Sequence, residues 1–161
     1  MHKVQIRHIS EKNYQWITGV LKERWGSVKI VSRGKITSAN KLPGFIAYFN
    51  NQPVGLITYS ILNDECEIIS LDSLQKSLGI GSSLLKEVVN EAKRQKLKRV
   101  WLVTTNDNIY AQQFYIKQGF KLVAIHKNAL EKSRQLKPGI PMLSKEGIPI
   151  KDEIEMEIEL F

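Results

Sequence analysis

One stretch of the chain, residues 65–120, constrains the fold more than any other. It begins with an apolar run typical of a strand, and two closely spaced glycines, Gly79 and Gly81, then precede an amphipathic helix. A second apolar run over residues 100–103 and a second short helix follow. Because a helix N-terminus presents backbone N–H groups and glycine admits a ligand close to the backbone, this order predicts an anion-binding turn.

The rest of the pattern predicts an α/β fold with one mixed sheet. Turn signals such as Asn50-Asn51 and Asn63-Asp64 separate β-rich runs, so consecutive antiparallel strands are expected. The helix between the strands at 65–71 and 100–103 predicts that these two strands pair in parallel. We expect about seven strands, mostly antiparallel and flanked by helices. A length of 161 residues suits a single domain, 1–161.

Several local expectations follow from the same pattern. Residues 27–43 have no regular periodicity and are expected to form a loop or a short second helix. Residues 137–150 are rich in proline and glycine and are expected to form an ordered flap. The last strand alternates apolar residues with glutamates, which predicts one buried face. Alternation along residues 65–71 predicts that Glu67 and Leu71 share one face and that Cys66 and Ser70 share the other.

The formal net charge of +8 favours anionic partners. Much of the basic charge lies on residues 86–98, where lysines and arginines alternate with glutamates. This alternation is typical of a solvated helix face, so neither nucleic acid nor a membrane is an expected partner. The N-terminus lacks the apolar block of a signal peptide, so the cytoplasm is the expected location. Cys66 is the only cysteine and the three histidines are scattered, so neither an intramolecular disulfide nor a metal site is expected.

Two other phosphate-binding motifs also use closely spaced glycines. A dinucleotide-binding fingerprint requires its glycines directly after a strand and a third glycine where Leu84 stands. A nucleotide-binding P-loop requires Gly-Lys-Ser/Thr after four spacer residues, and the chain has no such sequence. Both motifs are therefore excluded as an explanation of Gly79 and Gly81.

Two motifs together resemble the GNAT superfamily of acetyl-CoA-dependent N-acetyltransferases. The first is Arg or Gln, two residues, Gly, one residue, then Gly or Ala, and it matches residues 76–81 with Lys76 in the first place. The second, Asn-x-x-Ala-x-x-Phe-Tyr-x-x-x-Gly-Phe, matches Asn108, Ala111, Phe114, Tyr115, Gly119 and Phe120. Other segments, including residues 25–27 and 136–153, look like those of small bacterial members with undefined acceptors.

The resemblance implies acetyl-CoA as the co-substrate and no metal. In this interpretation the pyrophosphate lies on the backbone of the glycine turn, and the pantetheine arm pairs with backbone groups of residues 71–73 as an added strand does. The residues expected to bind the coenzyme are Leu71, Asp72, Ser73, Lys76, Leu78, Gly79, Ile80, Gly81, Ser82, Asn108 and Tyr115.

The implied reaction is direct transfer of the acetyl group to a primary amine of a small molecule, peptide or protein. The resemblance makes Tyr115 the candidate acid for the departing thiolate and Glu67 the candidate base for the amine. The alternatives are a core tyrosine and a solvated or ion-paired glutamate. The amide of Leu71 or of its neighbour is the candidate oxyanion donor. A covalent route through Cys66 is disfavoured, since its side chain points to the face opposite Glu67.

Residues 25–41 and 137–152 are expected to form the wall of the acceptor site. Arg33 would hold a carboxylate of the acceptor, and Asp152 or Glu153 would hold its amine, with surface ion pairs as the alternative role. A noncatalytic acyl-CoA-binding regulator is the alternative function. Both a monomer and a homodimer are compatible with the sequence.

Overall fold

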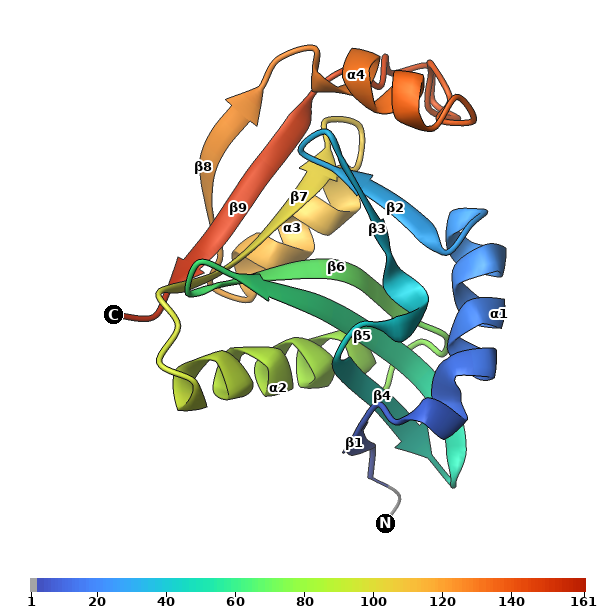
Figure 1. Cartoon of the computed structure of the whole chain (residues 1–161), viewed down its shortest axis with the longest axis vertical. Coiled ribbons are helices and arrows are strands. Elements are labelled where there is room, and N and C mark those ends of the chain that lie inside the picture. The colour runs from blue at the N-terminus through green and yellow to red at the C-terminus, as the bar shows by residue number, and fades with distance from the viewer. Residues whose placement is uncertain (1–2) are drawn as a thin grey trace. The chain divides into compact units, whose positions relative to one another are not determined.

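The computed structural model describes residues 3–161, which contain nine strands, four α-helices and two short 3-10 helices. Seven strands form one sheet in the order β1-β4-β5-β6-β7-β9-β8, and β2 pairs with β3 in a second sheet (Figure 1). The α/β class and the mixed, mostly antiparallel sheet are thereby confirmed. The bounds are β1 Gln5–His8, η1 Glu11–Asn13, α1 Tyr14–Trp25, β2 Lys29–Ser32, β3 Lys35–Ser38, η2 Ala39–Lys41, β4 Gly44–Phe49, β5 Gln52–Leu62, β6 Glu65–Ser73, α2 Ile80–Arg94, β7 Arg99–Thr105, α3 Ile109–Lys117, β8 Lys121–His126, α4 Ala129–Leu136 and β9 Glu153–Glu159.

These residues divide into two compact units. The first comprises the chain up to Ile30, Ser38–Val100 and Leu160–Phe161, and the second comprises Val31–Thr37 and Trp101–Glu159. The single domain expected from the chain length stays a prediction. Within residues 3–161, no helix combines the length and the apolar character needed to cross a membrane.

The first unit contains the antiparallel strands β1, β4, β5 and β6. Two-residue turns join β4 to β5 and β5 to β6, and all four turn residues have positive φ: Asn50 52°, Asn51 61°, Asn63 53° and Asp64 62°. Asparagine and aspartate tolerate this left-handed conformation, and such turns match the twist of paired strands. Both turns predicted from the sequence are therefore present.

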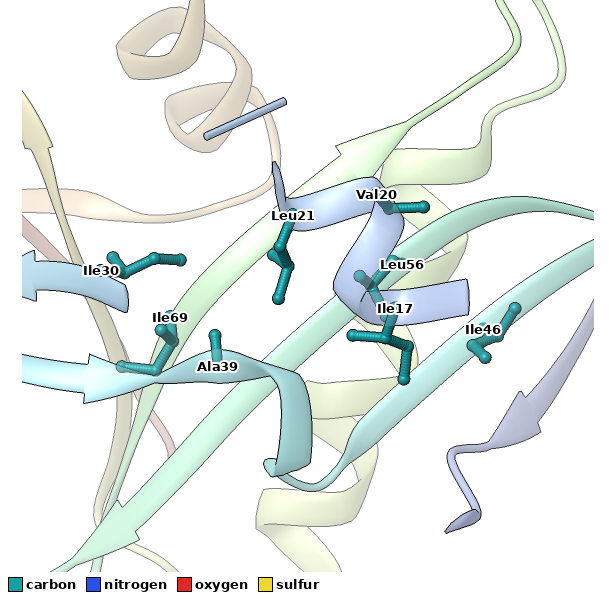
Figure 2. Close-up of a cluster of buried hydrophobic side chains, with 8 residues drawn as sticks. All are labelled: Ile17, Val20, Leu21, Ile30, Ala39, Ile46, Leu56 and Ile69. Carbon is teal, nitrogen blue, oxygen red and sulfur yellow. The ribbon is translucent and has the colours of Figure 1, made fainter. Parts of the chain in front are cut away.

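Helices α1 and α2 cover opposite faces of these strands (Figure 1). Residues of α1 pack in one apolar cluster with residues of β4, β5 and β6, and Figure 2 shows the cluster: Ile17, Val20, Leu21, Ile30, Ala39, Ile46, Leu56 and Ile69. On β5, Leu56 belongs to this cluster, whereas its neighbour Gly55 lies against Ile80 and Leu84 of α2. Adjacent strand residues point to opposite faces, so the two helices lie on different sides of β5.

A β-bulge in β6 corrects the predicted alternation of residues 65–71. Tyr59 is paired with Ile68 and Thr58 with Ser70, which leaves Ile69 as an extra residue. The hydroxyl oxygens of Thr58 and Ser70 lie 2.6 Å apart. Beyond the bulge the predicted faces are exchanged: Ser70 lies on the face of Glu67 that α1 covers, and Leu71 lies on the other. The prediction failed because a bulge depends on the partner strand.

The second unit includes β7 from Trp101 onward, α3, β8, α4 and β9, and its strands β8 and β9 are antiparallel. The prediction that β9 has a single buried face is wrong, because Glu153 and Glu157 are buried as well as Ile154 and Met156. Glutamates are rarely buried unless they are paired. Glu153 lies 3.0 Å from Nη1 of Arg33, and Glu157 lies 4.0 Å from Nζ of Lys121.

Residues 27–43 correct a second prediction. Instead of a loop or a second α-helix, they form the hairpin of β2 and β3, followed by the 3-10 turn η2. The hairpin turn consists of Arg33 and Gly34, with φ of 51° and 71°. Its strands are too short to produce a clear period-two pattern. Residues 137–150 form no helix or named strand, as expected, and contain one isolated bridge between Leu143 and Pro149.

Candidate active site

The glycine turn lies directly before α2. β6 ends at Ser73, and residues 74–79 lead to the first residue of α2, Ile80. Gly79 has φ of 65°, a left-handed conformation that favours glycine. The first turn of α2 contains no acidic residue, so nothing there opposes the positive end of the helix dipole. Lys76 is exposed within the turn. These features suit an anion.

Gly55 of β5 lets the start of α2 approach the sheet. A Cβ atom at this position would overlap Cγ2 of Ile80 and lie 3.1 Å from Cδ1 of Leu84. Ile80 is itself fully buried, so the first residue of α2 is held against β5. This role of Gly55 was not predicted from the sequence. A glycine inside a strand pattern is the signal that suggests such a close approach.

The end of β6 places Leu71, Asp72 and Ser73 immediately before the turn. Asp72 pairs with Leu56, so its side chain lies on the face that α1 covers. Nε1 of Trp25 donates to both carboxylate oxygens of Asp72, at 3.2 and 3.0 Å. Burial raises the pKa of Asp72, and the hydrogen bond from Trp25 and the charge of Arg24 oppose this shift. Trp25 is the last residue of α1, and it was predicted as the first residue of the acceptor-site wall.

Glu67 is half-buried and shares the α1 face of β6. Its neighbour on the other face, Cys66, is buried, and burial raises the pKa of the Cys66 thiol to about 12. Glu65 is engaged elsewhere, because one of its carboxylate oxygens lies 3.0 Å from Nε of Arg99. The carboxylate of Glu67 and the protonated thiol of Cys66 therefore lie on opposite faces of the strand.

Helix α3 carries the two candidate residues of the second motif. Oδ1 of Asn108 accepts a hydrogen bond from the backbone N–H of Ala111 at 3.1 Å, so Asn108 caps the helix. The same side chain keeps an NH2 group that can donate to a ligand. Tyr115 is buried against the rings of Phe114 and Phe120, with centroid distances of 5.2 and 5.5 Å. These aromatic contacts hold the ring of Tyr115 in one position.

The second unit brings two of the three predicted acceptor-binding residues into direct contact. The backbone N–H and Nη1 of Arg33 donate to the carboxylate of Glu153, at 3.2 and 3.0 Å. The guanidinium therefore compensates the buried charge of Glu153, and the pair holds the β2–β3 turn against the start of β9. Oδ1 of Asp152 instead accepts from the backbone N–H of Asn128 at 2.8 Å, at the start of α4.

Two side chains hold the flap of residues 137–152. Asn106 donates to the carbonyl of Pro149 at 2.8 Å and accepts from the N–H groups of Lys151 and Asp152 at 2.9 and 3.0 Å. Arg134 donates to the backbone carbonyls of three flap residues: Ile140, Pro141 and Ile150. The flap is therefore fixed at both of its ends. The flap was predicted from the sequence, but neither anchoring residue was.

Within residues 3–161, no group of three or more histidine, cysteine, aspartate or glutamate side chains is placed to hold a metal ion.

Known proteins resemble this chain over most of its length. Residues 7–120 match the acetyltransferase (GNAT) family. The uncharacterized protein YxbD of Bacillus subtilis is 41% identical over 145 residues, which are 89% of this chain and 91% of YxbD. The uncharacterized protein YdhI of the same organism is 42% identical over 139 residues, which are 86% and 87% of the two chains.

Solved structures share the fold. A GNAT family acetyltransferase from Elizabethkingia anophelis, solved with acetyl-CoA bound, has a TM-score of 0.69 at 19% identity, covering 98% of this chain and 99% of its own. The match to the family model spans more than half of the chain, and the two Bacillus relatives extend over most of it. The chain therefore belongs to the GNAT acetyltransferase family.

Proposed function

We propose that this protein is an N-acetyltransferase that moves the acetyl group of acetyl-CoA directly to a primary amine of a small molecule, peptide or protein. The observation that carries the proposal is the turn before α2. It has a left-handed Gly79, no acidic residue in the first helical turn, and a helix start that Gly55 allows to lie against β5. In a GNAT family member, such a turn suits the pyrophosphate of the coenzyme.

In this proposal the coenzyme binds mainly through the backbone. N–H groups at the start of α2 bind the pyrophosphate, and Lys76 adds a nearby positive charge. Backbone groups of residues 71–73 pair with the pantetheine amides. The NH2 group of Asn108 donates to the coenzyme while Oδ1 caps α3. The acetyl-CoA bound to the E. anophelis acetyltransferase supports the choice of co-substrate.

The chemistry requires a neutral amine and a protonated leaving group. Glu67 takes a proton from the ammonium form of the acceptor, directly or through water, because an alkyl amine with a pKa near that of lysine, about 10.4, is mostly protonated at neutral pH. The amine then attacks the thioester carbonyl, and the N–H of Leu71 stabilises the oxyanion that forms. As the C–S bond breaks, Tyr115 donates its phenolic proton to the sulfur.

Direct transfer is preferred to a covalent acetyl-cysteine. Only a thiolate is an effective nucleophile, and a buried thiol with a pKa of about 12 is almost entirely protonated at neutral pH. Cys66 also points to the face opposite Glu67. For the acceptor, we retain residues 25–41 and 137–152 as the wall of its site, with Asp152 as a candidate ligand. Arg33 and Glu153 neutralise each other, which favours a structural role for that pair.

Thiol release from acetyl-CoA, measured against a broad panel of amines, tests the proposal. Tyr115→Phe is expected to lower kcat about 10²- to 10⁴-fold, the usual contribution of a general acid, while the Kd for acetyl-CoA changes little. Tyr110→Phe is a matched control, because Tyr110 lies on the same helix and is mostly exposed. Coenzyme binding without any thiol release would favour the noncatalytic acyl-CoA-binding regulator, and an unchanged kcat would remove Tyr115 from the mechanism.

A further inference from the structure

The β-bulge in β6 lies beside a pair of buried hydroxyl groups. Thr58 of β5 and Ser70 of β6 face each other across the two strands, and the residues are 0% and 2% exposed. Their side-chain oxygens lie 2.6 Å apart, and within residues 3–161 neither hydroxyl has another hydrogen bond. Ile69, the extra residue of the bulge, packs in the apolar cluster shown in Figure 2. Each hydroxyl is therefore the polar partner of the other at the bulge.

A backbone hydrogen bond at the end of β6 shows which way the preceding N–H groups point. The N–H of Leu74 donates to the carbonyl of Val54, opposite it on β5, at 2.8 Å. Hydrogen-bonded and non-hydrogen-bonded pairs alternate along an antiparallel ladder. From Leu74 back to the bulge, every second residue of β6 is therefore bonded to β5. The N–H groups of Leu71 and Ser73 fall between these residues and point away from β5.

A register without the bulge would reverse this pattern. If Ile69 were paired with Thr58, every later residue of β6 would shift by one position and turn to the opposite face. The N–H of Leu71 would then be bonded to β5. The hydroxyl of Thr58 would lose its partner, because Ser70 would lie on the other face. The cost of leaving a buried hydroxyl unpaired disfavours this register by about 5- to 150-fold.

We propose that Thr58 and Ser70 are positioning residues, whose paired hydroxyls lock the bulged register of β6. In this register the N–H of Leu71 is directed to the thioester oxygen, and that of Ser73 is directed to the pantetheine arm. The lock acts through the backbone, and neither hydroxyl contacts a reacting atom. The role in acetyl transfer rests on the proposed acetyltransferase function, whereas the lock itself is a property of the two strands.

Nuclear Overhauser effects between Hα atoms test the lock without any turnover. In the bulged register, Ile57 and Leu71 form a non-hydrogen-bonded pair with Cα atoms about 4.5 Å apart, so a strong Hα–Hα signal is expected in the wild type. Without the bulge, Ile57 faces residue 70 instead. Ser70→Ala and Thr58→Val each leave one hydroxyl unpaired in both registers, so each is expected to add a signal between residues 57 and 70. A folded variant that shows only the wild-type signal overturns the lock.

Turnover tests the positioning role. In both single variants, kcat is expected to fall at least about 3-fold, and by no more than the 10²- to 10³-fold loss that follows removal of an oxyanion-hole donor. The double variant Thr58→Val/Ser70→Ala leaves no hydroxyl unpaired. It is therefore expected to have a higher Tm than either single variant but no higher kcat. If kcat recovers together with Tm, or stays at the wild-type value in a variant with the second signal, the positioning role is wrong.

Two controls accompany these variants. Thr58→Ser/Ser70→Thr exchanges the side chains and keeps both hydroxyls, so the wild-type signal and most of kcat are expected; a second signal here would contradict the lock. Ser133→Ala removes a buried hydroxyl of α4 that donates to the carbonyl of Ala129 at 3.3 Å, and it is expected to change neither measurement. If the wild type acetylates no amine, the positioning role fails with the proposed function, while the Hα signals still decide the lock.

Discussion

Gly55→Ala tests whether the close approach of α2 to β5 positions the glycine turn. The added Cβ would overlap Cγ2 of Ile80, lie 3.1 Å from Cδ1 of Leu84 and lie 3.3 Å from the carbonyl oxygen of Asp72. Ile80 has no space to move into, because it is buried and forms the first residue of α2. The helix start must therefore shift away from the strand, and the turn that precedes it must shift too.

The expected loss of stability combines two opposing effects. Overpacking a well-packed site costs about 1–3 kcal/mol, and replacing a strand glycine by alanine returns about 0.5–1 kcal/mol of backbone entropy. The net free energy of unfolding is expected to fall by about 1–2 kcal/mol. For a chain of this size, that corresponds to a Tm lower by about 2–8 °C. Affinity for acetyl-CoA is expected to fall as well, because the displaced residues would carry its pyrophosphate.

Gly19→Ala is the matched control. Gly19 lies within α1, and a Cβ there would meet no atom within 4 Å. Alanine is favoured over glycine inside a helix by about 0.8–1 kcal/mol, so this variant is expected to raise Tm and leave coenzyme affinity unchanged. Thermal unfolding and calorimetric titration with acetyl-CoA measure both quantities. If Gly55→Ala behaves like Gly19→Ala in both measurements, then the approach of Ile80 to β5 does not position the turn.

Two other predictions concern the flap and the buried thiol. Asn106→Ala removes three side-chain hydrogen bonds to residues 149–152. Faster amide hydrogen exchange is therefore expected in these residues, and the free energy of unfolding is expected to fall by about 1–3 kcal/mol. Exchange at the wild-type rate would contradict this anchoring role. Because burial raises the pKa of Cys66 from 9.0 to about 12, the unfolded state loses this proton first, and stability is expected to fall between about pH 9 and 12. In Cys66→Ala, the free energy of unfolding should fall less steeply with pH across this range. A slope equal to that of the wild type would refute the raised pKa of Cys66.

Much of the site could be predicted because its signals are local in the chain. Gly79 at a helix start, Asn108 as a helix cap and Asn50-Asn51 in a hairpin turn follow from conformational preferences within a few residues. The two motifs at residues 76–81 and 108–120 combine such preferences at defined spacings. The fold class also follows, because strand and helix periodicity limit how the elements can pack.

The errors arose where a residue depends on a strand or helix far away in the chain. The bulge at Ile69 is set by the register of β6 against β5, and it moved Ser70 and Leu71 to faces that simple alternation does not predict. The β2–β3 hairpin was missed because its four-residue strands carry too little pattern. β9 buries Glu153 because Arg33, 120 residues earlier, supplies the compensating charge.

By itself, the sequence determined the fold class, the glycine turn before α2 and the likeness to a family, since each depends on short-range preferences and spacing. Only the tertiary structure decided the environment of each charged side chain. From the sequence, Asp72 looked like one of several backbone contacts. The fold buries its carboxylate and brings it within hydrogen-bond distance of Trp25, which lies 47 residues earlier in the sequence. Burial and charge compensation depend on every element that packs around a residue, and local sequence does not contain that information.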